Sequence, residues 1–518
     1  ADYNTVVGKS ALGSDTLGNK STAMGYETLL NQNFTTATDS YNTAVGYQAG
    51  LTLTTGTLNT LVGSFAGYGL TTGVSNAIMG YAAGDALSDA DYNTAIGTSA
   101  LTSDTKGSRS VAVGYASLTL QNFTTATNSY NTAVGYEAGS NTTTGVNNTF
   151  IGGLAGDAIS TGDFNAVLGY NALGSETAGT RSVAVGASTL SAQNVGGGTT
   201  VYNTAVGHIA GFAVTTGIMN TLIGGAAGDA LTDADFNVAV GVQALTTDRL
   251  GSRSVAVGYR ALYSQDYGTT ATNSNNTAVG YVAGNAITTG THNVCIGANA
   301  GDEMTTGSDN TIIGVAACGT GVVTGDNNTV VGRNAGINLT TGDNNLLLGH
   351  DAGQTGSPGG NINTENNEIC LGDENIAEAH IQVSFVAASD ERDKTDFVDL
   401  DLGLDFIKAL EPVTYYWDKR SKYGDKYAED YDLDAQTPDG THKEDWMDIG
   451  FKAQAVRDLE EAAGYKASDK KNLTVTLSGD GKQYGLKYER FIPILVKAMQ
   501  EQDAIIQSLT ARIAALES

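Results

Sequence analysis

The chain has 518 residues, with 67 glycines, only four prolines and a formal net charge of −28. This charge argues against nucleic acid and anionic membrane surfaces as partners, because phosphate contacts need clustered Lys and Arg side chains. No stretch of the sequence approaches the ~20 apolar residues of a membrane-spanning helix, so membrane insertion is not expected.

The chain opens with an internal repeat. A core similar to NTAVG recurs with its glycine at residues 8, 25, 46, 63, 80, 97, 114, 135, 152, 169, 186, 207, 224, 241, 258, 280, 297, 314, 332, 349 and 372. The commonest step is 17 residues, which is too short for a helical repeat of about 34 residues and fits a β-solenoid. We therefore predict that residues 1–373 form a repeat shaft of 21 coils. Because the opening ADYNTVVG nearly repeats ADYNTAIG at Ala90–Gly97, we expect the native chain to begin further upstream.

Each coil combines a short apolar run such as AVG or LIG, a second small apolar pair such as YQAG or GAAG, and a turn such as TTG or SDT. This pattern predicts two brief strands per coil, joined by turns in which glycine supplies positive φ angles. Alternate residues of a strand face the same side, so we predict that the valine or isoleucine before each repeat glycine points inward, as at Val45, Val62, Val134 and Val279. The three cysteines form no CxxC pair, so neither a zinc site nor a disulfide framework is predicted. Those in NVCIG and EICLG are interpreted as small buried hydrophobes.

Steps of 21 or 22 residues mark four longer loops, which lie near Leu30–Tyr41, Leu120–Tyr130, Ser191–Tyr202 and Ser264–Asn275. The loops contain many Thr, Asn, Gln and aromatic residues, which suit sugar contacts by hydrogen bonding and stacking. We predict that they protrude and contact a receptor, for which a glycan is the expected class.

The NTAVGYQAG pattern resembles the head repeats of trimeric bacterial adhesins. The resemblance covers Ala1–Asp373, although the usual step here is longer than that of the family. It implies an all-β shaft, a left-handed parallel β-roll or β-solenoid in which three chains pack around one axis. The repeated threonines would also suit an ice-binding solenoid, but a solvated β-face explains them equally well.

The composition changes after the shaft and a connector at residues 374–388. Residues 389–518 hold 18 of the 27 basic residues, both tryptophans and three of the four prolines. They contain, in order, SDERDK, LEPVTYYW at Leu410–Trp417, GFKAQAV at Gly450–Val456 and a closing helix at residues 488–518. This series resembles the intramolecular chaperone domain that ends many phage tail fibres and tailspikes, a self-cleaving peptidase family. The resemblance implies an α+β domain that drives trimerisation.

The resemblance also implies a catalytic pair within SDERDK. Ser389 would attack the carbonyl of Ala388, Lys394 would accept the serine proton, and Asp390 and Arg392 would complete the motif. The chain would be cut once, in cis, between Ala388 and Ser389. A lysine accepts a proton near neutral pH only when desolvation lowers its pKa, which assembly of the subunits would provide.

Two features of the motif leave alternatives open. Asp393 stands where an apolar residue is expected, and a negative charge beside the lysine favours its charged form. Ser389 could instead cap a helix whose first turn holds Asp390 and Glu391, residue types that are favoured there.

The closing helix carries an apolar seam in steps of three and four, formed by Ile492, Leu495, Met499, Gln502, Ile506, Leu509, Ile513 and Leu516. Ile at a and Leu at d favour a dimer in an isolated coiled coil, so the homotrimer is predicted from the two resemblances instead.

The histidines share no metal-ligand spacing, so no metal or other cofactor is predicted, except for an ion that three copies of His380 would gather on a threefold axis.

These features together predict the distal part of a phage tail fibre, located in the virion and joined to upstream fibre or baseplate proteins. One alternative is a bacterial trimeric surface adhesin, which should end in a membrane anchor rather than in an acidic helix. A polysaccharide-degrading tailspike is less favoured, because it needs a catalytic carboxylate pair and carboxylates such as Asp157 and Asp229 occupy turn positions.

Overall fold

The computed structural model describes residues 2–382, 385, 387–426, 428 and 430–517. Both termini of the predicted domains, Ala1 and Ser518, and residues 383, 384 and 386 of the predicted connector therefore lie outside the described residues. The chain divides into two compact units, Ala1–Ile312 and Ile313–Ser518. The last coils of the repeat group with the C-terminal region in this division, and each unit is described by itself.

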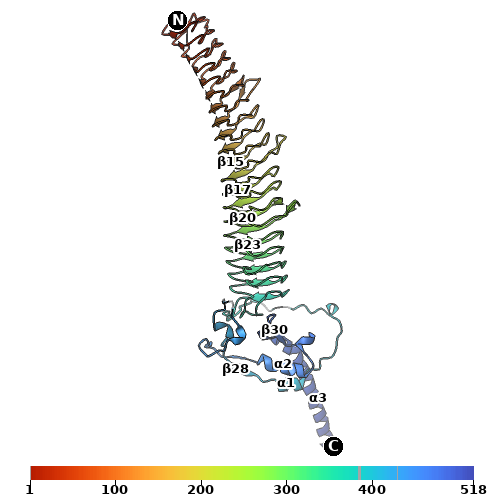
Figure 1. The fold of residues 1–518 in the computed structure, drawn as a ribbon. Coiled ribbons are helices and arrows are strands. Elements are labelled where there is room, and N and C mark those ends of the chain that lie inside the picture. Colours follow the sequence, from red (N-terminus) through yellow and green to blue (C-terminus); the bar gives the residue numbers. More distant parts are fainter. Residues whose placement is uncertain (1, 383–384, 386, 427, 429, 518) are drawn as a thin grey trace. The chain divides into compact units, whose positions relative to one another are not determined.

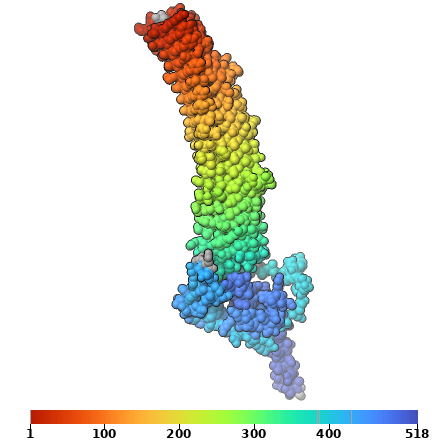
Figure 2. Space-filling model, viewed as in Figure 1, coloured from red at the N-terminus to blue at the C-terminus, as the bar shows by residue number. Residues whose placement is uncertain are grey.

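The repeat folds as a parallel β-solenoid of about 20 turns, as predicted, with one three-residue strand in each turn (Figure 1). These strands are β1 (Thr5–Val7), β3 (Thr22–Met24), β5 (Thr43–Val45), β6 (Thr60–Val62), β7 (Ala77–Met79), β8 (Thr94–Ile96), β10 (Val111–Val113), β12 (Thr132–Val134), β13 (Thr149–Ile151), β14 (Ala166–Leu168), β15 (Val183–Val185), β16 (Thr204–Val206), β17 (Thr221–Ile223), β18 (Val238–Val240), β20 (Val255–Val257), β22 (Thr277–Val279), β23 (Val294–Ile296), β24 (Thr311–Ile313), β25 (Thr329–Val331), β26 (Leu346–Leu348) and β27 (Ile369–Leu371). In the first unit the coils lie on one another in chain order, as the sequence of colours shows (Figure 2). The left-handed winding stays a prediction.

The predicted facing of the strands is wrong by one residue. Strands β5 and β6 pair in parallel with Ala44 opposite Leu61 and Val45 opposite Val62. Ala44 and Leu61 are fully buried, whereas Val134 and Val279 are 37% and 36% exposed and Val45 is half-buried. A three-residue strand sends only its central side chain inward, because successive side chains alternate between faces. The apolar residue before each repeat glycine, usually Val or Ile, therefore lies on the outer face of the sheet.

The prediction of two strands per coil is also wrong for most coils. The second apolar segment forms no strand: Ala49 of YQAG is buried but lies in a turn, and the buried Leu53 follows that turn without regular structure. Additional two-residue strands occur beside three of the four longer loops and pair in parallel with one another: β2 (Gly18–Asn19) with β4 (Thr38–Asp39), β9 (Gly107–Ser108) with β11 (Thr127–Asn128), and β19 (Gly251–Ser252) with β21 (Thr272–Asn273). Cys295, Cys318 and Cys370 are buried, so the interpretation of the two repeat-core cysteines as buried hydrophobes is confirmed.

A ladder of buried asparagines runs through the interior. Asn59 accepts a hydrogen bond at Oδ1 from the backbone N–H of Asn76 (3.0 Å), and its Nδ2 donates to the carbonyl of Gly73 (2.9 Å). The same pattern links Asn42 to Asn59 in the preceding coil. Each asparagine thereby satisfies backbone groups of the coil that follows it, which buried polar groups require.

The repeat glycine is needed where neighbouring coils meet. Gly46 has a φ angle of +141°, which side chains rarely tolerate, and a Cβ at this position would collide with the carbonyl of Gly63 in the next coil. Coils can therefore stack closely only if glycine stands here.

The C-terminal region contains short helices, two antiparallel strand pairs and one long helix. Its elements are α1 (Leu404–Ala409), β28 (Val413–Tyr415), β29 (Asp448–Gly450), α2 (Ala453–Ala462), β30 (Val475–Leu477), β31 (Tyr484–Leu486) and α3 (Phe491–Glu517), with 3-10 turns η1 (Glu391–Asp393), η2 (Arg420–Lys422), η3 (Leu433–Ala435), η4 (Ala467–Asp469) and η5 (Tyr488–Arg490). Strands β28 and β29 pair antiparallel, as do β30 and β31. This confirms the predicted α+β region and its closing helix.

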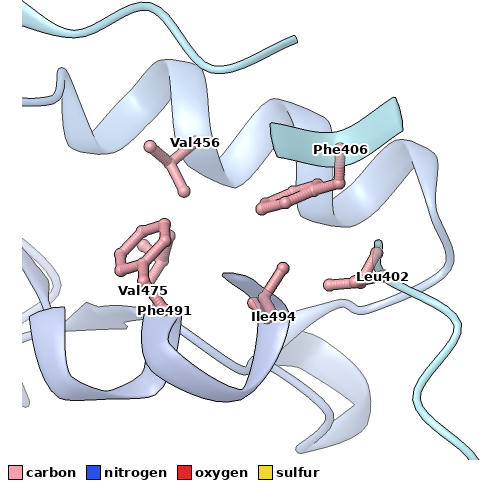
Figure 3. Packing of buried hydrophobic residues seen from close by; sticks show 6 residues of the cluster. All are labelled: Leu402, Phe406, Val456, Val475, Phe491 and Ile494. Atoms are coloured by element: carbon pink, nitrogen blue, oxygen red, sulfur yellow. The ribbon is translucent and has the colours of Figure 1, made fainter. Parts of the chain in front are cut away.

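The core of this region brings together residues that are distant in the sequence. Its buried side chains come from α1 and the segment before it, from α2, from β30 and from the start of α3, and they are Leu402, Phe406, Val456, Val475, Phe491 and Ile494 (Figure 3). Beyond Ala498, the described residues of α3 contribute no buried side chain. No helix in the part of the chain that the structure describes has the length and hydrophobicity of a membrane-spanning segment.

Candidate functional site

Ser389 and Lys394 lie side by side at the two ends of a single turn. The turn η1 places Lys394 Nζ 2.5 Å from Ser389 Oγ and 3.3 Å from the carbonyl oxygen of Ser389. The N–H of Lys394 donates to the carbonyl of Glu391 (3.1 Å), which closes the turn and brings residues five apart in the sequence together.

The turn is held by Asp390 and Arg392. Asp390 is its N-cap and accepts a hydrogen bond from the backbone N–H of Arg392 (2.9 Å), and the Arg392 guanidinium also donates to its carboxylate (2.6 Å). This side-chain pair lowers the pKa of Asp390 and keeps the carboxylate charged. The alternative that Ser389 caps the turn is wrong, because Asp390 occupies that position and Ser389 Oγ contacts the lysine instead. Asp390 and Arg392 therefore position the pair without contacting Ser389 Oγ.

The arrangement suits a serine nucleophile whose proton is taken by an amine. A base must lie within hydrogen-bond reach of the hydroxyl that it deprotonates, and 2.5 Å meets this condition. Ala388, Ser389 and Lys394 are all exposed in the single chain, so bulk water reaches the pair. Asp393 forms no ion pair with Lys394 within 4.0 Å in the described part of the chain.

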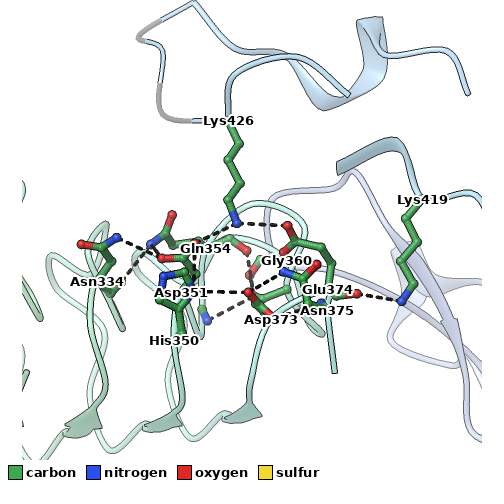
Figure 4. A network of polar contacts seen from close by, with 12 residues as sticks. Asn334, His350, Asp351, Gln354, Gly360, Asp373, Glu374, Asn375, Lys419 and Lys426 are labelled. Carbon is green, nitrogen blue, oxygen red and sulfur yellow. Dashed lines mark hydrogen bonds and ion pairs between the residues drawn. The ribbon is translucent and has the colours of Figure 1, made fainter. Parts of the chain in front are cut away.

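A second polar cluster joins the last coils of the shaft to the C-terminal region (Figure 4). Lys426 Nζ lies 2.8 Å from Asp351 Oδ2 and 3.0 Å from Glu374 Oε1, and Lys419 Nζ donates to the carbonyl of Glu374 (2.7 Å). Burial alone would lower the pKa of Lys426, but the two carboxylates together raise it above its usual value. Both carboxylates are buried, so the lysine compensates charges that water cannot reach.

Sequence reasoning missed this cluster. His350, Asp351 and Asp373 have donor atoms within 4.8 Å of one another, a spacing suited to a cation, although no metal site was predicted. The ammonium group of Lys426 already contacts Asp351, so we interpret the cluster as an ion-pair network. The HD dipeptide at 350–351 was the available signal, but its partners lie 23 and 75 positions further along the chain. His380, the proposed axial ligand, is exposed and pairs with Glu378 (3.0 Å).

The four longer loops are less open than predicted. In one of them Gln121 is fully buried, and its Nε2 donates to Asp104 (2.6 Å) and to Ser110 (2.8 Å). The aromatic side chains Phe34 and Phe123 at the loop bases are also buried. These side chains therefore fill the widened coils, whereas the loop tips at residues 35–37 and 124–126 and neighbours such as Asn33, Asn122 and Asn128 are exposed.

Residues 389–465 match the family model described as "Chaperone of endosialidase". The comparisons with curated proteins and with solved structures gave no match. The matched segment begins at Ser389 and includes the paired strands β28 and β29, which carry parts of the LEPVTYYW and GFKAQAV motifs. A β-solenoid followed by a chaperone-of-endosialidase domain fits a tail fibre or tailspike with a C-terminal chaperone domain.

Proposed function

We propose that the chain is the distal, host-recognising part of a phage tail fibre, and that its C-terminal domain drives assembly of a homotrimer and then cuts itself off before Ser389. The observation that carries the proposal is the 2.5 Å contact between Ser389 Oγ and Lys394 Nζ at the first residues of the matched domain. The fibre belongs to the virion, and upstream fibre or baseplate proteins are its expected neighbours.

The proposed cleavage consumes only water. Ser389 Oγ attacks the carbonyl carbon of Ala388 while the neutral amine of Lys394 accepts the hydroxyl proton. The peptide C–N bond then breaks, and the lysine returns the proton to the leaving nitrogen of Ser389. Ala388 is held as an ester on Oγ until water hydrolyses it, which leaves a carboxylate on Ala388 and a free amine on Ser389.

Assembly is proposed to switch the reaction on. A water-exposed lysine amine is mostly charged at neutral pH and cannot accept a proton, so the pair needs a cover that removes water. The apolar seam of α3 supports association, because Ile506, Leu509 and Ile513 are each about half exposed in the single chain. In the proposed trimer, which this seam would hold together, a neighbouring subunit covers the exposed pair.

Receptor binding is assigned to the shaft, with a glycan as the expected receptor. The exposed loop tips carry Thr35, Thr36, Thr124 and Thr125, which offer hydroxyl groups to a sugar. Deleting the loops would also remove buried groups such as Gln121, so substitution of the tips by serine–glycine pairs is the cleaner test. Loss of adsorption to host cells is expected, with the coils still folded.

The cleavage is tested by denaturing gels and mass spectrometry of the purified full chain. We expect two fragments that meet between Ala388 and Ser389, and a full-length chain for Ser389→Ala and Lys394→Ala. Native size measurements should show that both variants still assemble. Asp393→Leu removes a negative charge next to the lysine and is expected to speed the cut.

Three other results of this experiment would change the assignment of the cleavage site or limit it. A wild-type chain that stays intact while Asp393→Leu is cut would show a competent but damped site. If neither chain is cut after native assembly, the protease assignment fails and the domain acts in folding alone. Cleavage that persists in Ser389→Ala would exclude Ser389 as the nucleophile.

A further inference from the structure

One outward column of residues on the shaft combines a positive φ angle, which also recurs at other turn positions of the coils such as Gln48 and Phe65, with aromatic and basic side chains. In each coil, the residue immediately before the position of the buried asparagine ladder has a positive φ angle, for example +50° at Tyr41, +58° at Tyr92 and +63° at Arg109. Side chains other than Asn and Gly are disfavoured in this region, and bulky ones most of all. Several coils nevertheless place an aromatic or basic residue there, and strained positions of this kind gather at functional sites.

The column contains two sandwiches in which an arginine lies between two aromatic rings. The Arg109 guanidinium lies 5.1 Å from the ring centre of Tyr92 and 5.8 Å from that of Tyr130. The Arg181 guanidinium lies 5.4 Å from the ring centre of Phe164 and 5.8 Å from that of Tyr202. The four rings are each about half exposed, and both arginines are exposed. The arginines are four coils apart, which corresponds to about 19 Å at the usual strand spacing.

An equivalent position near the start of the shaft shows what these two sandwiches lack. Lys20 lies over the ring of Tyr41, and its ammonium pairs with Asp39 at 2.7 Å. At the position that corresponds to Asp39, the Nε of Arg109 donates a hydrogen bond to the neutral Asn128 Oδ1 (3.0 Å). The Nη1 of Arg181 likewise donates to the hydroxyl oxygen of Thr200 (3.1 Å). In the described part of the chain neither arginine forms an ion pair, although the protein carries 55 acidic residues. Both cations are thus left open to an external anion.

We propose that the two sandwiches, Tyr92–Arg109–Tyr130 and Phe164–Arg181–Tyr202, form a binding site for a carboxylated polysaccharide. A guanidinium group binds a carboxylate through two parallel hydrogen bonds, and each arginine still has N–H groups available for this. The flanking rings offer flat apolar faces to the sugar rings on either side of the carboxylate. A polymer that repeats its carboxylate fits two cations held about 19 Å apart on one face. The inference rests on the proposed function and names its receptor class and site.

The test measures binding of the purified full chain to three probes by calorimetry: polygalacturonate, neutral dextran and dextran sulfate. Polygalacturonate is expected to bind, with an affinity that falls as salt rises, and dextran is not. Arg109→Gln with Arg181→Gln should weaken polygalacturonate binding at least about tenfold, since two charge-assisted contacts are lost. The control pair Lys106→Gln with Arg333→Gln removes the same charge outside the column and should change the affinity less than about twofold.

A second pair of variants keeps both arginines and changes only their neighbours. Asn128→Asp with Thr200→Asp recreates the pairing of Lys20 with Asp39, so it should abolish binding while the rings and cations remain. The reverse change, Asp39→Asn, frees Lys20 and should strengthen binding. Thermal unfolding of each variant confirms that the shaft remains folded.

Several outcomes would overturn the inference: no binding of polygalacturonate, equal binding of dextran, tight binding of dextran sulfate alone, or unchanged affinity in both arginine-directed pairs. Failure of the proposed function looks different. Polygalacturonate binding that depends on Arg109 and Arg181, without adsorption of the labelled chain to host cells, would uphold the site and refute receptor binding. Adsorption that is undiminished in Arg109→Gln with Arg181→Gln would uphold receptor binding and refute the site.

Discussion

Asp248 shows how a single buried carboxylate couples the shaft to pH. It is fully buried at the base of the fourth longer loop, where it accepts hydrogen bonds from the N–H of Gly251 (2.9 Å) and from Nε2 of Gln265 (2.5 Å). Burial raises the pKa of Asp248 to about 6, because the charged form loses its hydration. Asp104 holds the equivalent place at another loop, and burial raises its pKa as well.

The sign of the pH effect follows from the raised pKa. The folded chain binds the Asp248 proton more readily than the unfolded chain, so this residue adds stability as pH falls from above 6 to below about 4. Asp248→Asn removes this dependence. We expect the difference in unfolding free energy between wild type and variant to change by on the order of 2–3 kcal/mol between pH 7 and pH 4. Urea unfolding at a series of pH values measures it.

Asp89→Asn provides the matched control, because it removes an exposed carboxylate of the same shaft. The difference in unfolding free energy between Asp89→Asn and wild type should stay nearly constant over the same pH range. A constant difference for Asp248→Asn as well would mean that Asp248 titrates alike in the folded and unfolded chains, against the expected raised pKa.

The coil illustrates what sequence patterns can and cannot establish. Its period and the position of its strands were predictable because both follow from the spacing of one motif. The facing was misassigned because Ala44 and Val45 are both apolar, and an alternating pattern needs one residue of known direction. Asn42 supplies that direction: it is buried in the ladder, so Ala44, two residues on, also faces inward.

In the C-terminal region, contacts within one turn could be predicted from the sequence, but contacts between distant residues could not. Ser389 and Lys394 were predictable as a pair because only one turn separates them, and the resemblance pointed to both residues. Lys426 was not, because its partner Asp351 lies 75 residues earlier, and no local pattern encodes such a contact. The hydrophobic core could not be predicted for the same reason, because it brings together residues as distant in the sequence as Leu402 and Ile494.

The asparagine ladder makes a prediction about one rung. Asn59→Ala would leave the carbonyl of Gly73 and the N–H of Asn76 buried without their side-chain partners. Each such loss costs about 1–3 kcal/mol, so a drop in unfolding free energy on the order of 2–6 kcal/mol is expected. Hydrogen exchange should rise first in the two coils that flank the substitution.

Thr60→Ala changes the next residue, which is exposed on the outer face of β6, and serves as the control. It should leave exchange in these coils close to that of wild type. Equal effects of the two substitutions would show that the ladder contributes no more than the outer face.

At the scale of the whole molecule, Lys426 is expected to keep the two products of cleavage together. It compensates Asp351 and Glu374, and removing one partner of a buried ion pair costs about 3–5 kcal/mol. Lys426→Met should lower the unfolding free energy of the uncut Ser389→Ala chain by about that amount. In the cut chain it should release the C-terminal fragment from the shaft during size-exclusion chromatography.

The exposed Lys466 offers the control, because Lys466→Met changes the same side chain away from the cluster. Lys466→Met should change neither the unfolding free energy of the uncut chain nor the retention of the C-terminal fragment in size-exclusion chromatography. Retention of the fragment in Lys426→Met together with unchanged stability of the uncut chain would assign the attachment to other contacts, such as that of Lys419 with Glu374.

The seam of α3 carries the last prediction, which concerns assembly and cleavage together. Ile506 and Leu509 are about half exposed, and α3 has no buried residue after Ala498 among those described. An apolar stripe on an otherwise solvated helix is stabilised by burial against a partner, and here the proposed partners are two further copies of the chain. Ile506→Asp with Leu509→Asp places charges in that interface and should yield a monomer in light scattering. Because the Ser389–Lys394 pair is exposed in the single chain, the same variant should also remain uncut.

The control introduces the same two charges on the opposite face of the helix, as Ser508→Asp with Ala511→Asp. It should assemble and be cut as wild type is, since these positions lie outside the seam. A seam variant that is monomeric yet fully cut would separate cleavage from assembly, and the water around Lys394 would then have to be excluded within one chain. A seam variant that still forms trimers would assign the association to the outer face of the shaft, where the valines before the repeat glycines lie.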